Sequence, residues 1–170
     1  GWWGGAHPFG LLDCSVVHNG EISSYDANRR YIEMFGYKCT LLTDTEVITY
    51  IIDFLTRKKG LNIVEAAHVI AAPFWAVIDE MEPEQRDYYT YLRMTFSSML
   101  VTGPFSILVA YEGGIMALND RLKLRSMVAA VKGNTAYFAS EESAIRAIQL
   151  ELDSVWAPSG GEPVIFELQK

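Results

Sequence analysis

Apolar residues in the first hundred positions recur every three or four residues, which is the spacing of amphipathic helices. The strongest such segment is 43–59, in which Thr43 and Glu46 have the spacing of a capping box and Gly60 follows the last turn. The same spacing predicts a helix over 25–35, one or two helices over 62–81 with a break near Pro73, and a helix over 83–100. The N-terminal half is therefore expected to be mainly helical.

After position 100 the pattern changes to short apolar runs separated by turn residues, which is typical of strands. Strands are predicted over 105–111, 114–118, 127–131, 135–139 and 163–168, in addition to an early one over 11–18. Gly133-Asn134 favours a hairpin, and Asn19-Gly20 is a turn signal at the end of the early strand. A helix over 141–150, capped by Ser140, completes the pattern. Helices and strands in separate runs predict an α+β fold with antiparallel sheets.

Composition narrows the class of protein. The 170 residues suit one domain, and half of them are hydrophobic, which is enough for a buried core. A net charge of −7 argues against a nucleic-acid partner, because such proteins usually carry a basic patch. No apolar run reaches the ~20 residues of a membrane helix, so no membrane partner is expected. Two cysteines are too few for a disulfide framework and fit a reducing, cytoplasmic location.

Polar residues are concentrated in three segments, next to predicted strands or at the start of a helix. The first contains Ala6-His7-Pro8-Phe9 and then Val17-His18-Asn19-Gly20-Glu21-Ile22, and the second is Thr43-Asp44-Thr45-Glu46-Val47-Ile48. The third runs from Ala117-Leu118-Asn119-Asp120-Arg121 to Arg125 and is followed by Tyr137-Phe138-Ala139-Ser140-Glu141. In this order the chain resembles class II glutamine amidotransferases, and most closely the glutaminase domain of glutamate synthases and their archaeal-type relatives. The resemblance covers nearly all of residues 1–170, as the C-terminal portion of such a domain.

The resemblance implies an N-terminal-nucleophile hydrolase fold, which is a four-layer α-β-β-α sandwich of antiparallel sheets, here incomplete at the N-terminus. It implies an enzyme of nitrogen assimilation that hydrolyses the side-chain amide of glutamine to glutamate and ammonia. The ammonia would pass to a synthase site in another domain or subunit. In the family a cysteine at the mature N-terminus attacks the amide, and its own α-amino group, with a pKa near ~8, acts as the base. No cofactor is implied for this domain.

Asn19 and Gly20 match the oxyanion hole of the family. Amide hydrolysis places negative charge on the carbonyl oxygen, and prearranged N–H donors there contribute about 3–4 kcal/mol. Taken without the neighbouring motif residues, Asn-Gly would indicate only a hairpin turn. Asp44 matches the residue that binds the α-ammonium group of glutamine. A carboxylate at the start of a helix is also stabilised by the helix dipole, and the two roles are compatible.

The histidines are expected to support the site rather than to react. His18 is predicted to orient the Asn19-Gly20 turn through its ring nitrogens, and His7 to fix a loop near the pocket. His68 lies in an apolar helical segment and is predicted to be packed there. The three histidines have no ligand spacing, so no metal site is predicted.

The nucleophile is expected outside this chain. Residue 1 is glycine rather than cysteine, and the arginine that holds the α-carboxylate of glutamine in the family is expected just before it. Cys14, with His18 as base, is an alternative nucleophile, although a cysteine within a strand is more often a small buried residue. Cys39 is assigned to a strand.

The chain is therefore expected to bind glutamine together with its N-terminal segment and a synthase domain or subunit, and to be inactive alone. The alternative is a non-catalytic relative that binds or senses glutamine. Whether the chain forms a homo-oligomer, and which molecule accepts the ammonia, stay open.

Overall fold

The structure, a computed structural model, describes residues 6–168, so the expectation about residue 1 lies outside the described residues. The helices are α1 (Tyr25–Glu33), α2 (Asp44–Asp53), the π-helix η2 (Phe54–Lys58), α3 (Ile63–Ile70), α4 (Trp75–Asp79), α5 (Pro83–Thr95), the 3₁₀-helix η3 (Ser97–Met99) and α6 (Glu142–Arg146). The strands are β1 (Phe9–Leu11), β2 (Cys14–Gly20), β3 (Phe105–Tyr111), β4 (Gly114–Asn119), β5 (Val128–Lys132), β6 (Thr135–Ala139), β7 (Ser154–Trp156) and β8 (Val164–Glu167).

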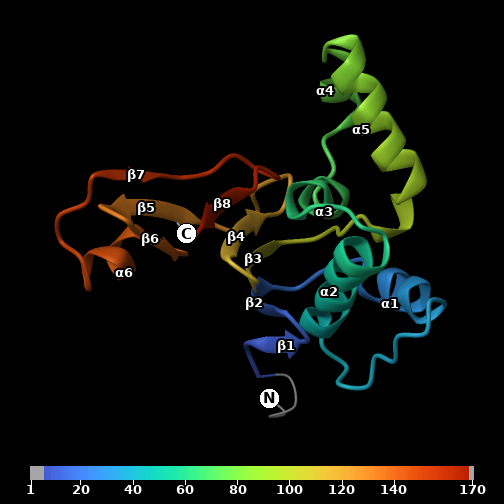
Figure 1. Cartoon of the computed structure of the whole chain (residues 1–170), viewed down its shortest axis with the longest axis horizontal. Coiled ribbons are helices and arrows are strands. Elements are labelled where there is room, and N and C mark those ends of the chain that lie inside the picture. The colour runs from blue at the N-terminus through green and yellow to red at the C-terminus, as the bar shows by residue number, and fades with distance from the viewer. Residues whose placement is uncertain (1–5, 169–170) are drawn as a thin grey trace.

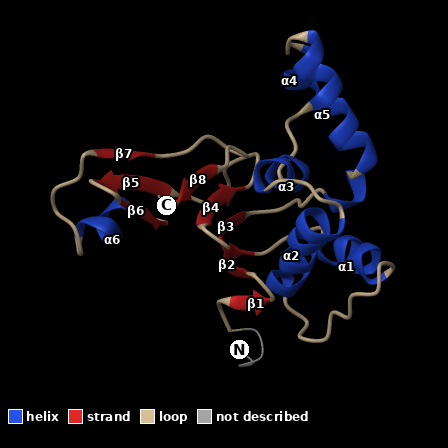
Figure 2. Ribbon diagram, in the orientation of Figure 1, coloured by secondary structure: helices blue, strands red, loops and turns tan. Residues whose placement is uncertain are grey.

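The strands form two antiparallel sheets (Figure 2). The larger sheet has the order β1-β2-β3-β4-β8, and the smaller has the order β6-β5-β7. β2 and β3 pair along their whole length, from Cys14 opposite Tyr111 to Gly20 opposite Phe105. The end of β2 that carries the motif is thereby fixed against β3.

The two faces of the larger sheet bury different sets of side chains. One face packs on α1, α2 and α3 through the main apolar core (Figure 1). The other face packs on the smaller sheet through a second cluster that contains Leu108, Ala117, Val164, Ala129, Phe138 and Trp156. α6 lies beside β6. A sheet held between helices and a second antiparallel sheet confirms the predicted α+β architecture.

The early strand region differs from its prediction. The expected single strand is a β1–β2 hairpin, whose turn contains Leu12 with a φ of 51°. Asn19-Gly20 is not a hairpin turn, because both residues pair with β3, at Ser106 and Phe105. Long-range strand pairing therefore overrides the local turn preference of the Asn-Gly pair.

Helix ends also differ from the sequence pattern. The side chain of Thr43 does not cap α2, and the Glu46 carboxylate instead accepts the N–H groups of Thr40 and Leu41 at 3.0 and 2.8 Å. A capping box forms at α3 between Asn62 and Glu65. The expected long helix from 43 to 59 changes to π-helical geometry after α2.

The C-terminal part contains three further corrections. α6 is shorter than the predicted 141–150 helix, and Glu141 rather than Ser140 is its N-cap residue. The short strand β7 was missed by the sequence pattern. Cys39 is a buried residue of the loop between α1 and α2 and does not lie in a strand.

Candidate functional site

The candidate site lies where β2 ends beside the start of α2. Alternate side chains of β2 point to opposite faces of the larger sheet. His18 points into the helical layer and is buried, whereas the exposed Asn19 points toward the smaller sheet. α2 begins at Asp44 and packs on β2. His18 and Asn19 are adjacent in sequence, but their side chains therefore lie on opposite faces of the larger sheet at the end of β2.

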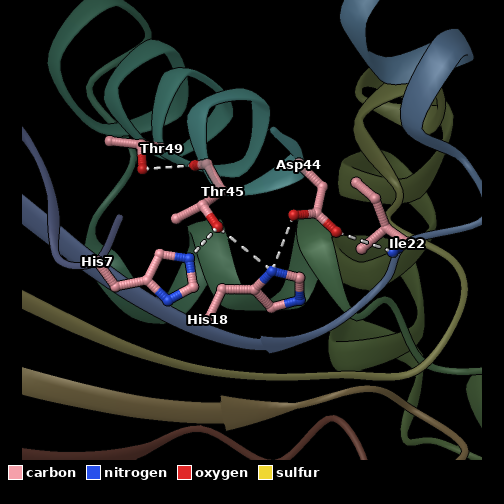
Figure 3. A network of polar contacts seen from close by, with 6 residues as sticks. All are labelled: His7, His18, Ile22, Asp44, Thr45 and Thr49. Carbon is pink, nitrogen blue, oxygen red and sulfur yellow. Dashed lines mark hydrogen bonds and ion pairs between the residues drawn. The ribbon is translucent and has the colours of Figure 1, made fainter. Parts of the chain in front are cut away.

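Asp44 is held by contacts to β2 and to the segment after it (Figure 3). Its Oδ1 lies 3.2 Å from Nδ1 of His18, and its Oδ2 accepts the backbone N–H of Ile22 at 3.2 Å. The Asp44 side chain is 19% exposed, so one side still reaches solvent. The carboxylate is fixed in orientation but remains open to a ligand.

His18 links Asp44 to a second polar pair. The hydroxyl of Thr45 lies 2.8 Å from Nε2 of His7 and 3.4 Å from Nδ1 of His18. An ionised carboxylate only accepts hydrogen bonds, so the contact with Asp44 requires the proton on Nδ1 of His18. Nε2 of His18 is buried and has no hydrogen-bond partner among residues 6–168. His18 thus acts on the orientation of Asp44, in addition to any effect on the Asn19-Gly20 segment.

The pKa values in this network reflect both burial and charge. Burial tends to raise the pKa of Asp44, but the hydrogen bond and charge of His18, with the N–H groups of Ile22 and Thr45, outweigh it and lower that pKa. Burial lowers the pKa of His7, and nearby His18 lowers it further, whereas Asp44 opposes the shift. Asp44 is therefore ionised at neutral pH.

The backbone conformation and the close neighbours of position 20 require a glycine there. Its φ is +147°, and a Cβ at this position would lie 2.0 Å from the carbonyl oxygen of Pro104. The neighbouring backbone N–H of Glu21 donates to that same oxygen at 3.0 Å. Close approach of two backbone segments explains why glycine stands at the end of β2.

The structure places Gly20 and Asp44 on one hollow and Asn19 on another. Gly20 and Asp44 line an open, polar hollow of about 350 Å³, together with Glu21, Ile22 and Thr43. Asn19 lines a smaller hollow of about 100 Å³ between the two sheets. The end of β2 separates them, so a ligand that contacts all three residues would lie across this strand end.

Two site contacts involve residues that the sequence did not single out. Nδ2 of Asn19 donates to the hydroxyl of Ser140 at 3.2 Å, which ties the strand end to the smaller sheet. Thr45 joins the two histidines, as described above. Thr45 follows Asp44 and Ser140 belongs to the third motif segment, but the sequence assigned neither residue a role in the site, and it assigned Ser140 only to a helix cap.

The remaining candidates lie elsewhere. Cys14 is at the opposite end of β2 from Gly20, about 20 Å away at the usual rise of a strand, and lines a separate cavity of about 420 Å³. Burial and the charge of Asp53 raise the pKa of Cys14 to about 11. Burial, with Glu46 and Glu33, raises the pKa of Cys39 to about 11. His68 is a packed residue of α3, and burial lowers its pKa.

Neither a metal cluster nor a membrane helix is found in the part of the chain that the structure describes. Between residues 6 and 168, no three His, Cys, Asp or Glu side chains gather closely enough to hold a metal ion. No helix in this range is long and apolar enough to span a bilayer.

Comparison with known proteins gives relatives of greater length. No family model matches the chain. It is 53% identical over 169 residues to an uncharacterized protein of Archaeoglobus fulgidus, covering 99% of this chain and 45% of that protein. It is 29% identical over 167 residues to a putative glutamine amidotransferase of Methanothermobacter thermautotrophicus, covering 96% and 45%. The chain thus spans less than half the length of these relatives.

Solved structures show the fold. The glutamine phosphoribosylpyrophosphate amidotransferase of B. subtilis aligns with a TM-score of 0.63 and 16% identity, over 98% of this chain and 30% of that one. Its match includes the two stacked antiparallel sheets and the helices beside them, which confirms the fold expected from the motifs. The chain therefore has the N-terminal-nucleophile hydrolase fold and is similar in sequence to a putative glutamine amidotransferase.

Proposed function

We propose that this domain is the glutamine-hydrolysing part of a class II glutamine amidotransferase. Asn19 and Gly20 would donate N–H groups to the oxygen of the amide under attack, and Asp44 would bind the α-ammonium group of glutamine. The observation that carries the proposal is the position of Gly20 and Asp44 on one open hollow, with Asn19 next in the strand. A small amino acid fits the scale of this hollow.

The electrostatics of the hollow support a cationic group at Asp44. The lowered pKa of Asp44 keeps its carboxylate ionised, and His18 and Ile22 hold it in one orientation. A charge-assisted hydrogen bond from an ammonium group contributes about 1.5–3 kcal/mol. The substrate would be anchored at its α-amino end while its amide reaches the oxyanion donors.

The nucleophile is proposed to come from outside these 170 residues. A thiolate must add to the amide carbon within reach of Asn19 and Gly20. The amide nitrogen must then accept a proton and leave as ammonia, and water hydrolyses the resulting thioester to release glutamate and the thiol. Cys14 lies at the far end of β2, and raised pKa values keep both Cys14 and Cys39 in the thiol form at neutral pH. We accordingly expect this chain alone, which also contains no assigned clamp for the α-carboxylate, to be inactive.

The fate of the ammonia is proposed from the sequence resemblance. The motifs favour transfer to a synthase site of the glutamate synthase type, in a further domain or a partner subunit. Among the similar structures, one is named for transfer to phosphoribosylpyrophosphate, so the acceptor must be identified by assay with the longer protein.

The test is ammonia release from glutamine by the purified chain, with and without an added N-terminal fragment that carries the cysteine. Turnover only on complementation, and its loss in Asn19→Ala, would support the proposal. Turnover by the chain alone that disappears in Cys14→Ala would refute it and assign the nucleophile to Cys14. Glutamine binding without turnover in the complemented assembly would instead favour the non-catalytic alternative.

A further inference from the structure

Residues 74–95, which contain α4, α5 and the turn between them, form an arm that projects from the rest of the molecule (Figure 1), and most of these residues are exposed. Of the thirteen residues of α5, only Leu92 is buried. Trp75, Tyr91 and Met94 are 43%, 62% and 69% exposed. Isolated helices shorter than about 12–15 residues are marginal in water, so a projecting helix of this length gains from a further contact.

One face of α5 has the pattern of a contact surface. Glu84, Asp87, Tyr91 and Met94 follow at the three- and four-residue spacing that places side chains on one helix face. The first two are acidic and the last two are large and apolar. The end of the arm, residues 79–87, holds five carboxylates and one arginine, and we call it the acidic tip.

A second exposed patch has the opposite charge. The basic loop, residues 121–125, contains Arg121, Lys123 and Arg125 and no acidic residue. Between these cations, Leu122 and Leu124 are 63% and 56% exposed. The basic loop therefore exposes apolar as well as cationic side chains.

The basic loop is held in one conformation by the residue before it. Asp120 is 3% exposed, and its carboxylate accepts the N–H groups of Leu122 at 3.0 Å, Leu124 at 2.9 Å and Arg125 at 3.2 Å. Because the backbone amides turn inward to Asp120, the side chains of the loop project outward. A patch fixed in this way loses little conformational entropy when it binds.

Arg121 places the basic loop at the base of the arm, away from its tip. Its guanidinium group lies 4.4 Å from the centre of the Phe74 ring and donates to the carbonyl oxygen of Ala72. Each molecule therefore carries the acidic tip at one end of the arm and the basic loop near the other end.

We propose that two copies of this chain associate through a two-fold contact in which the acidic tip of each arm packs on the basic loop of the other. A two-fold interface uses the same pair of patches twice, so opposite charges meet at both places. Contact between two acidic tips would instead bring like charges together. Leu122 and Leu124 of the basic loop would lose water in the same contact.

The first test measures the mass of the 170-residue chain by sedimentation equilibrium. We expect a reversible dimer that weakens in 1 M salt, where the Debye length falls to about 3 Å. A tip variant, Glu82→Lys with Glu84→Lys and Asp87→Lys, and a loop variant, Lys123→Glu with Arg125→Glu, should each raise the dimer dissociation constant by at least about tenfold.

Mixing the two variants is the decisive test. In the mixed dimer the reversed tip meets the reversed loop, and the second contact is native, so association should return. A control that reverses exposed charges elsewhere, Asp13→Lys with Glu112→Lys and Glu151→Lys, should dimerise like the wild type. Circular dichroism checks that every variant is folded.

Three results would overturn the proposal. The wild-type chain could stay monomeric at the highest concentration measured, which would mean that the arm does not bind a second copy of this chain. The mixture of variants could remain monomeric while the wild type dimerises. The control could lose association as strongly as the tip and loop variants.

Discussion

Removal of the Asp44 carboxylate is expected to lower the stability of the chain by about 2–3 kcal/mol. Asp44→Ala deletes the contact with Nδ1 of His18 and the acceptor of the Ile22 N–H, both at 3.2 Å. Hydrogen bonds to charged groups contribute about 1.5–3 kcal/mol each, and the helix-start position adds about 0.3–1 kcal/mol. The expected loss is smaller than the sum of these contributions, because both contacts are long and the side chain of Asp44 is 19% exposed.

Urea unfolding of the 170-residue chain measures this loss. With a slope near 2 kcal/mol per molar urea, the midpoint should fall by roughly 1 M or more. The folded pKa of Asp44 is lowered, so its stabilisation is present above the unfolded pKa of about 3.9 and is lost as pH falls through the folded value. The difference between wild type and Asp44→Ala should therefore shrink only in strong acid.

Asp26→Ala is the matched control. Asp26 also lies in the first turn of a helix, α1, but it is exposed. Its removal should cost only the helix-start contribution, under about 1 kcal/mol. Equal losses for Asp26→Ala and Asp44→Ala would refute the reasoning, because the contacts of Asp44 to His18 and Ile22 would then contribute nothing.

Three further outcomes test other parts of the site. Gly20→Ala should destabilise the chain by on the order of 3 kcal/mol or more in urea unfolding, since its Cβ would lie 2.0 Å from the Pro104 oxygen; a stable variant would contradict the close approach. Asn19→Ala should lower ammonia release by the complemented assembly about 10²–10³-fold while leaving the urea midpoint nearly unchanged, and a small loss of rate would show that Asn19 is not an oxyanion donor. Alkylation of Cys14 should be slow at pH 7 and accelerate toward its pKa of about 11, so fast reaction at pH 7 would contradict a partly buried, protonated thiol.

The local sequence pattern predicted most of the helices and strands, and the sequence motifs identified the candidate residues of the site. The strands over 105–111 and 135–139 were predicted with the bounds that the structure has, and the break near Pro73 separates α3 from α4. These signals depend on residues close in sequence, through side-chain alternation and the backbone limits of proline. The motif residues Asn19, Gly20 and Asp44 were likewise found from the sequence, and their catalytic roles stay predictions.

Only the tertiary structure decided what these residues contact. Pairing with β3 placed Asn19 and Gly20 inside a strand, although their local preference is for a turn. The same pairing places the side chains of His18 and Asn19 on opposite faces of the larger sheet. There His18 contacts Asp44, and Asn19 contacts Ser140, which is 121 positions away in sequence. Such contacts depend on the free energy of packing distant segments together, which overrides preferences of a few tenths to about 1 kcal/mol in the local sequence.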